Sequence, residues 1–141
     1  MNKELMFSSK SNEWETPQYL FDELDLKYHF TLDPCSTADN AKCKKYYTIK
    51  EDGLSQDWQG ETVFCNPPYG RELSKWIKKC YEESRKPDTI VVMLIPARTD
   101  TKAFHEYILG KSEIHFIKGR LKFNGHRHNA PFPSMWVAMG I

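Results

Sequence analysis

The 141 residues are enough for one domain with a hydrophobic core, and the 13% aromatic content argues against a disordered chain. The formal net charge of +1 gives no overall basic excess that would by itself indicate nucleic-acid binding. No apolar run approaches the length of a membrane span, and the N-terminus lacks the apolar segment of a signal peptide. We therefore expect a folded cytoplasmic protein without a membrane partner.

The cysteines indicate neither a metal site nor an oxidising compartment. Cys35, Cys43, Cys65 and Cys80 are widely spaced, without the Cys-x-x-Cys pair that is common in zinc sites. No metal is therefore expected. Cys65 and Cys80 fall on apolar positions of predicted elements, and we interpret them as small core residues. Reduced thiols agree with the cytoplasm.

The N-terminal part of the sequence predicts an arm followed by a helix. Residues 1–13 are polar and predict a loose arm, with a single domain over 14–141. Thr16 and Pro17 have the pattern of a helix N-cap followed by proline at the first helical position. Apolar residues at helical spacing then predict a short helix over 17–25.

The rest of the chain predicts alternating strands and helices. Residues 29–34 predict a strand that ends at an acid and a proline, whereas the patterns between 35 and 61 are weaker. The continuous apolar run from Thr89 to Ile95 is typical of a strand covered on both faces. The other expected elements are a strand over 46–49, a turn at 52–54, strands over 62–65, 114–117 and 134–139, and helices over 71–86 and 101–109.

This alternation predicts an α/β fold with a mostly parallel sheet and helices on both faces. In such sheets, ligands bind outside the carboxyl ends of the strands. Asp33, Asn66 and the Pro96–Arg98 segment each follow a predicted strand. We therefore expect these residues to line one site.

The most informative motif is Asn66-Pro67-Pro68-Tyr69, which follows the strand predicted over 62–65. Two prolines remove two backbone donors and fix two φ angles, so the turn is rigid and rich in acceptors. Such a turn suits a planar group that carries an NH2. By local pattern alone, it could also be an ordinary proline-rich turn.

An adenine amine is a poor nucleophile because its lone pair is delocalised into the ring. If the Asn66 side-chain oxygen and the Pro67 carbonyl each accept one N6 hydrogen, the nitrogen can pyramidalise toward a methyl donor. These acceptors act most strongly in the transition state, where positive charge grows on nitrogen. Pro68 would stiffen the turn, and Tyr69 would stack on a base that has left the duplex.

A basic segment closes the sequence. No Asp or Glu follows Glu113, whereas this stretch contains Lys118, Arg120, Lys122 and Arg127. The bias is compatible with a phosphate backbone, although a solvated basic loop explains the charge equally well. His126 and His128, two residues apart, do not form a convincing metal site.

With these motifs in order, the sequence resembles the small phage-type DNA N6-adenine methyltransferases over roughly residues 12–140. Beyond the Asn66 motif, the resemblance includes Trp14-Glu15-Thr16-Pro17, Leu32-Asp33-Pro34-Cys35, Asn40-Ala41-Lys42-Cys43, Asp52-Gly53-Leu54, Leu94-Ile95-Pro96-Ala97-Arg98-Thr99-Asp100-Thr101, Gly119-Arg120-Leu121-Lys122-Phe123 and Ala130-Pro131-Phe132-Pro133. It implies a Rossmann-like methyltransferase fold of reduced size.

The resemblance also implies S-adenosylmethionine as cofactor, without a metal, and DNA as substrate. Asn66, Pro67, Pro68 and Tyr69 would be the catalytic residues. The implied cofactor-binding residues are Trp14, Thr16, Pro17, Asp33, Pro34, Cys35, Asp52, Leu54 and Asn66. Thr16 would donate to the cofactor carboxylate, and Asp52 would hold the adenine ring with Leu54 packed on it. The candidate DNA contacts are Arg71, Arg98, Lys102, Arg120, Lys122 and Arg127.

The reaction expected from the resemblance is direct in-line transfer of methyl to N6 of a flipped adenine. It would take place in the host cytoplasm, in a protein that is a monomer or weak homodimer, and a role in protecting phage DNA from restriction is implied. An RNA adenine or a protein glutamine is an alternative substrate, and a catalytically silent nucleic-acid-binding module is a third interpretation. By local pattern alone, Asp33 is better explained as a cap or turn acid, and Asp52 before Gly53 forms a common turn pair. Arg98 could simply lie in an exposed loop with capping residues.

Overall fold

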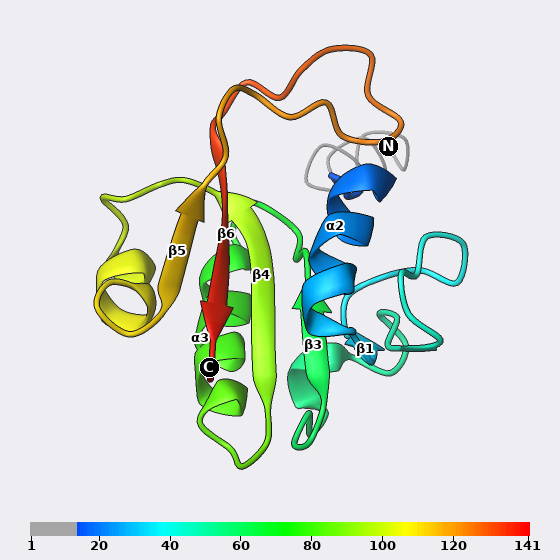
Figure 1. Ribbon diagram of the computed structural model, residues 1–141, viewed down its shortest axis with the longest axis vertical. Helices are drawn as coiled ribbons and strands as arrows, with labels where there is room; N and C mark the ends of the chain where they lie inside the picture. The colour runs from blue at the N-terminus through cyan, green and yellow to red at the C-terminus, as the bar shows by residue number, and fades with distance from the viewer. Residues whose placement is uncertain (1–13) are drawn as a thin grey trace.

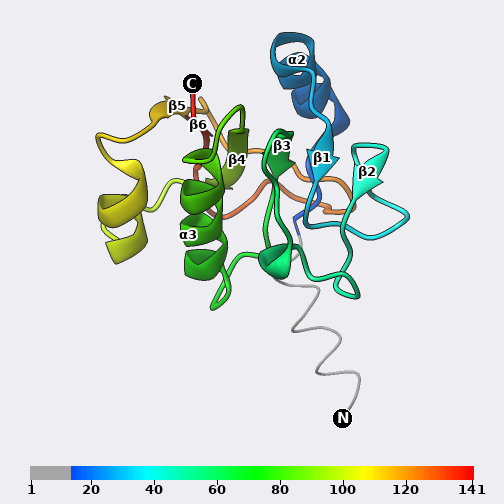
Figure 2. The same cartoon turned by 90° about the horizontal axis from the view of Figure 1, so that it is seen from below.

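The computed structural model describes residues 14–141, so the predicted arm over 1–13 lies outside the described residues. One sheet of six strands has the order β2-β1-β3-β4-β6-β5 (Figures 1 and 2). β1, β2, β3 and β4 run parallel, whereas β6 is antiparallel to both β4 and β5. The fold is therefore mixed α/β with a mostly parallel sheet, as predicted. The strands are β1 (Leu32–Asp33), β2 (Lys45–Tyr46), β3 (Thr62–Cys65), β4 (Ile90–Pro96), β5 (Glu113–Phe116) and β6 (Ser134–Met139).

Within residues 14–141, the helical elements are α2, α3 and two short helical segments. α3 agrees closely with the amphipathic pattern in the sequence, whereas the helix predicted over 101–109 is mainly a π-helical turn. The turn expected at 52–54 is a 3₁₀ turn, preceded by Asp52 with φ of 59°. The bounds are α2 (Gln18–Tyr28), η1 (Gly53–Ser55), α3 (Leu73–Ser84) and η2 (Phe104–Ile108).

The predicted N-cap of α2 is wrong. The helix begins after Pro17, and no side chain caps its first turn. The Thr16 hydroxyl instead accepts a hydrogen bond of 2.9 Å from the Asn66 amide. The local pattern of a cap is therefore overridden by a contact with a residue fifty positions away.

The strand predicted over 29–34 is shorter than expected. Only Leu32 and Asp33 pair with β2, and Leu32 also pairs with Val63 of β3. Pro34 has no N–H to continue the ladder. The amide of Phe30 is already bonded to the Asp25 carboxylate at the end of α2. The ladder is thus limited at both ends by local groups.

Alternate residues of β4 belong to two separate apolar clusters. Val91, Met93 and Ile95 pack in the cluster that contains the apolar residues of α3 and η2. Val92 and Leu94 pack in the cluster that contains the apolar residues of α2. Successive side chains of a strand point to opposite faces, so this alternation follows from the strand geometry. Every residue from Val91 to Ile95 is buried, as the continuous apolar run indicated.

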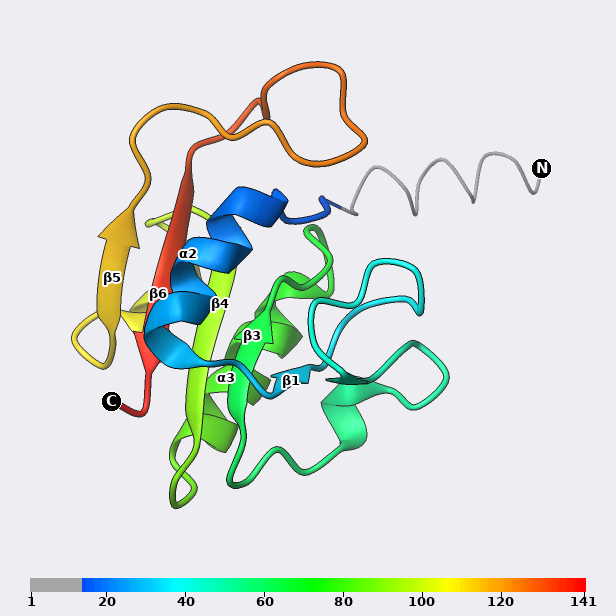
Figure 3. The same ribbon diagram turned by 45° about the vertical axis from the view of Figure 1, so that its right-hand side comes forward.

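A long connection between β5 and β6, residues 117–133, extends beyond the end of the sheet where α2 begins (Figures 1 and 3). We call this segment the β5–β6 loop. It lies against residues 14–16, which we call the entry segment. Glu15 and Asn124 form an antiparallel bridge, in which the Asn124 amide donates to the Glu15 carbonyl at 3.0 Å. The entry segment and the β5–β6 loop thus meet beyond the end of the sheet.

Gly53 joins the η1 turn to the loop after β1 by close contact. A Cβ atom at this position would lie 2.1 Å from the Pro34 carbonyl oxygen and 3.1 Å from the Trp76 ring. The Gly53 carbonyl also accepts a 3.0 Å hydrogen bond from the indole of Trp58, which is fully buried. The packing therefore requires glycine for space.

We expect Gly53→Ala to lower the free energy of unfolding by roughly 1–3 kcal/mol, because the new methyl group meets backbone that cannot move without loss of packing. Chemical denaturation measures this change. Lys78→Ala, on an exposed position of α3, is the control and should stay within about 0.5 kcal/mol of the parent protein. Equal stability of Gly53→Ala and the parent would contradict the packing at Gly53.

Candidate active site

A cleft of about 450 Å³ opens at the carboxyl ends of β1 and β3. The entry segment, the loop after β1, the Asn66 turn and the tip of the β5–β6 loop form its walls. The lining residues are Trp14, Glu15, Thr16, Asp33, Cys35, Ser36, Thr37, Asn40, Lys42, Ile49, Phe64, Asn66, Pro67, Pro68, Asn124, Gly125 and His126. Asp33 and Asn66 thus share one site, as expected from their positions after parallel strands. The Pro96–Arg98 segment was expected at the same site but does not line this cleft, because Pro96 and Arg98 line a separate, smaller cavity.

The Asn66 carboxamide is hydrogen-bonded through both of its ends. Its amide nitrogen donates to the Trp14 carbonyl at 2.5 Å and to the Thr16 hydroxyl at 2.9 Å. Its oxygen accepts from the Tyr69 hydroxyl at 2.7 Å. The Trp14 carbonyl can only accept, so the amide nitrogen and not the oxygen must face it. The orientation of the carboxamide is therefore determined by the entry segment.

Tyr69 differs from the sequence expectation, because its ring does not face the cleft. The side chain is 3% exposed and packs edge-to-face with Phe123 and Phe132. Its hydroxyl lies 3.0 Å from the Leu94 carbonyl as well as near Asn66. Burial raises the pKa of the phenol well above its usual range, so the hydroxyl keeps its proton. Stacking of a base on Tyr69 would require the ring to leave this packing.

One Tyr69 proton serves two acceptors. A phenol hydroxyl carries one hydrogen, so it can donate fully either to the Asn66 oxygen or to the Leu94 carbonyl. Rotation about the C–O bond exchanges the two acceptors. The Asn66 oxygen can therefore be released for another donor while the Tyr69 hydroxyl stays hydrogen-bonded.

The entry segment is held in place by aromatic as well as backbone contacts. Trp14 stacks on His126 with a centroid distance of 4.2 Å and an interplanar angle of 9°. Its ring also meets Phe123 and Phe132 edge-on. Together with the bridge between Glu15 and Asn124, these contacts secure the backbone that holds Asn66.

Asp33 organises the loop after β1. Its two carboxylate oxygens accept from the backbone amides of Cys35 at 3.3 Å and Lys42 at 2.9 Å. Burial raises its pKa to about 6, against the lowering effect of these amides and of the Lys42 charge. The carboxylate thus keeps the loop in a fixed shape, although the loop has no glycine.

Ser36 supplies an unpaired polar atom at the wall of the cleft. Its hydroxyl oxygen is buried and has no hydrogen-bond partner among residues 14–141. A buried hydroxyl without a partner costs free energy unless a ligand or water pairs with it. This position is therefore suited to a polar group of a bound ligand.

The predicted cofactor residues fall into two groups. Trp14, Thr16, Asp33, Cys35 and Asn66 line the cleft. The other four are not among its lining residues: Pro17, Pro34, Asp52 and Leu54. Pro17 and Pro34 are buried, and the exposed Asp52 carboxylate accepts from the Leu54 amide at 3.3 Å, while Leu54 packs against the core.

Sequence reasoning did not identify several cleft residues as part of the site. Ser36, Asn40 and Lys42 lie in or beside motifs that carried the family resemblance, so this proximity was an available signal. Asn124 and His126 reach the cleft only because the β5–β6 loop folds back over the entry segment. Nothing in the local sequence indicates that contact.

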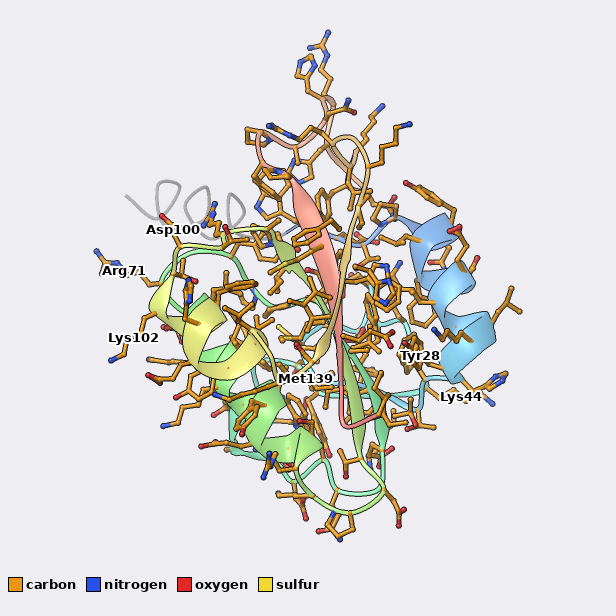
Figure 4. The ribbon with its side chains drawn as sticks, turned by 60° about the vertical axis from the view of Figure 1, so that its left-hand side comes forward. Tyr28, Lys44, Arg71, Asp100, Lys102 and Met139 are labelled. Carbon is orange, nitrogen blue, oxygen red and sulfur yellow. The ribbon has the colours of Figure 1, made fainter. Side chains whose placement is uncertain are left out.

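The six predicted DNA contacts are all exposed. Arg120, Lys122 and Arg127 lie on the β5–β6 loop, and Arg98 follows β4 beside Phe132. Arg71 and Lys102 project from one side of the molecule, opposite to Lys44 (Figure 4). Arg98 also lines a smaller cavity of about 140 Å³ between α3 and η2, which includes Gly70 from the Asn66 turn.

Comparison with known proteins places this chain among methyltransferases. A DNA N-6-adenine-methyltransferase of Haemophilus phage HP1 (strain HP1c1) is 30% identical over 119 residues, which cover 83% of this chain and 68% of the phage protein. A putative methyltransferase of Escherichia coli (strain K12), YfdM, is 35% identical over 65 residues, which cover 41% of this chain and 71% of the relative.

The family model described as DNA N-6-adenine-methyltransferase (Dam) matches residues 5–134. The chain belongs to this family, which confirms the resemblance found from the motifs. It also confirms the predicted class of enzyme, an adenine-specific DNA methyltransferase.

Two further observations concern ligands and membranes. Among residues 14–141, no group of three His, Cys, Asp or Glu side chains is arranged to hold a metal ion. None of the helices in that part of the chain is long and apolar enough to cross a membrane.

The Asp33 carboxyl should make stability depend on pH. Its pKa in the folded protein, about 6, lies above the ordinary value of 3.8. Asp33 therefore contributes stability that is present below about pH 4 and is lost as the pH rises through about 6.

We expect the difference in unfolding free energy between the parent and Asp33→Asn to shrink by up to about 3 kcal/mol between pH 4 and pH 7.5. Denaturant titrations at both pH values measure it. The asparagine variant removes the titration of this group, and its loss of one acceptor oxygen shifts stability equally at both pH values. A difference that is independent of pH would contradict the raised pKa of Asp33.

Proposed function

We propose that this protein transfers a methyl group from S-adenosylmethionine to N6 of adenine in DNA, by direct in-line attack on a base flipped out of the duplex. The observation that carries the proposal is the rigid Asn66 turn at one wall of the cleft, in a chain of the DNA N-6-adenine-methyltransferase family. The turn supplies acceptors for an amine, and the cleft has room for a methyl donor.

The cleft is compatible with S-adenosylmethionine. The unpaired Ser36 hydroxyl and the proton of the Thr16 hydroxyl are available to polar groups, while Trp14, Phe64 and the exposed Ile49 offer apolar surface. We propose that Trp14, Thr16, Asp33, Cys35 and the backbone of Asn66 hold the cofactor. Pro17, Pro34, Asp52 and Leu54 would support these residues from outside the cleft. When bound, the cofactor supplies a sulfonium methyl group as electrophile.

The chain's own contribution to catalysis is placement of the target amine. Asn66 would accept one N6 hydrogen on its side-chain oxygen, and the Pro67 carbonyl would accept the other, while Pro68 keeps the turn rigid. The Tyr69 hydroxyl releases the Asn66 oxygen by donating to the Leu94 carbonyl instead. Stacking of Tyr69 on the base remains the alternative that the motif predicts. It would require the ring to leave Phe123 and Phe132 and to give up the Leu94 bond, and it would also release the Asn66 oxygen.

We further propose a Rossmann-like arrangement of one domain over residues 14–141, with helices on both faces of the sheet. The two apolar clusters support it, because α2 packs in one and α3 with η2 in the other (Figures 1 and 2). The protein would act in the cytoplasm, the host's if phage-encoded, as a monomer or weak homodimer.

The direct test measures methyl transfer from isotopically labelled S-adenosylmethionine to duplex DNA, with N6-methyladenine identified by mass spectrometry of the nucleosides. RNA and a mixture of proteins are offered in parallel reactions. Label in N6-methyladenine of DNA is the expected result. Label found only in RNA or in glutamine would support one of the alternative substrates. No transfer at all would support the interpretation as a catalytically silent nucleic-acid-binding module.

We expect Asn66→Ala to abolish turnover but to keep cofactor binding, because the side chain acts on the amine rather than on the methyl donor. Turnover is measured with the labelled cofactor, and the dissociation constant of S-adenosylmethionine by calorimetry. Gln59→Ala, on an exposed turn, is the matched control and should keep full activity. A near-normal rate for Asn66→Ala would refute its role.

We expect substitution of the basic residues on the β5–β6 loop to weaken DNA binding uniformly across sequences. Each of Arg120→Ala, Lys122→Ala and Arg127→Ala should make the plot of log affinity against log salt shallower by about 1, because one phosphate contact is lost. Fluorescence anisotropy with labelled duplex measures the slope. Lys44→Ala, opposite to Arg71 in Figure 4, should leave it unchanged. Identical slopes for all four variants would exclude this loop from the DNA interface.

A further inference from the structure

We infer that Thr16 is a positioning residue for the reaction, because its hydroxyl holds the Asn66 carboxamide in the orientation that receives the target amine. This inference deepens the proposed function and rests on it. It assigns Thr16 a task separate from the predicted contact with the cofactor carboxylate.

An asparagine side chain does not fix its own orientation. Its terminal torsion is broad and nearly two-fold, so partners must select one orientation. The Asn66 nitrogen has two hydrogens, and each has an acceptor, the Trp14 carbonyl and the Thr16 hydroxyl. Both donors of the carboxamide are thus used by the entry segment.

Of the three hydrogen bonds of the Asn66 carboxamide, only the two from its nitrogen can persist during the reaction. The third partner, the Tyr69 hydroxyl, occupies the same oxygen that the substrate amine needs. When the amine replaces it, the bonds from the nitrogen to Trp14 and Thr16 alone prevent rotation of the carboxamide. Loss of either bond would let the acceptor turn away from the amine.

The Thr16 hydroxyl is itself held in position by its surroundings. Thr16 is 2% exposed, and the proline that follows it restricts its backbone to extended conformations. On its other side, Glu15 is bridged to Asn124 and Trp14 is stacked on His126. The acceptor is therefore presented by backbone that is secured from both sides.

The two tasks of Thr16 do not exclude each other. A hydroxyl has one hydrogen to donate and lone pairs to accept. Thr16 uses a lone pair for Asn66, which leaves its hydrogen for a ligand in the cleft. A change that removes the hydroxyl should therefore show a loss in kcat if Thr16 positions Asn66, and a loss in cofactor affinity if it binds the cofactor.

The test compares Thr16→Val, which removes the hydroxyl at nearly constant volume, with Thr16→Ser, which keeps it. We expect Thr16→Val to lower kcat about 10-fold at saturating cofactor and DNA, the effect of one hydrogen bond of roughly 1.4 kcal/mol, and Thr16→Ser to stay within about threefold of the parent. An unchanged kcat with weaker binding of S-adenosylmethionine would overturn the inference. Should Thr16→Val not fold, Thr16→Cys carries the same comparison, because a thiol is a weak acceptor.

A second measurement is independent of activity. Thermal midpoints are recorded for the parent, Thr16→Val, Asn66→Ala and the double variant. If Thr16 acts through Asn66, Thr16→Val should lower the midpoint clearly in the parent background but much less in the Asn66→Ala background. Equal shifts in both backgrounds would overturn the inference. Lack of methyl transfer by the parent protein would instead refute the proposed function. The four thermal midpoints would still show whether Thr16 acts through its hydrogen bond to Asn66.

Discussion

The hydrogen bonds of the Asn66 carboxamide connect the parts of the structure that matter for its chemistry. They join the entry segment, the turn after β3 and, through the Tyr69 hydroxyl, the end of β4. Each of these segments is held by a different part of the fold. The side chain that we propose as the acceptor for the substrate amine therefore has its orientation determined by tertiary structure and not by its own turn alone.

The β5–β6 loop has two effects in this arrangement. It presents basic side chains to solvent, and it closes over the entry segment through the Glu15–Asn124 bridge and the Trp14–His126 stack. Movement of the loop would therefore be transmitted to the Trp14 carbonyl, and from there to Asn66. DNA that binds to the loop would act on the same backbone that orients the carboxamide.

The sequence predicted those features that depend on local pattern and simple topology. The strands β3 and β6 have the predicted bounds, because their apolar runs end at prolines, glycines or polar residues. Asp33 and Asn66 share a cleft, because the carboxyl ends of parallel strands meet at one edge. The family followed from motifs that occur in the right order along most of the chain.

Features that depend on long-range contacts could not be predicted in this way. Thr16 has the pattern of a helix cap, but its hydroxyl bonds to Asn66. The Tyr69 ring is covered by Phe123 and Phe132, which lie in the β5–β6 loop far along the sequence. His126 gives no sequence signal of its stack on Trp14. In each case, a partner fifty or more residues away outweighs the local preference.

The position of β6 has a consequence for how the protein folds. β5 precedes β6 in the chain, yet within the described sheet it is hydrogen-bonded only to β6, which lies between it and β4. The antiparallel side of the sheet can therefore form only after β6 has paired with β4. Until Ser134–Met139 is in place, one side of β4 and both sides of β5 remain without strand partners. During synthesis these edges stay open until β6, which follows β5 in the chain, is available to pair, and unpaired strand edges of this kind favour aggregation.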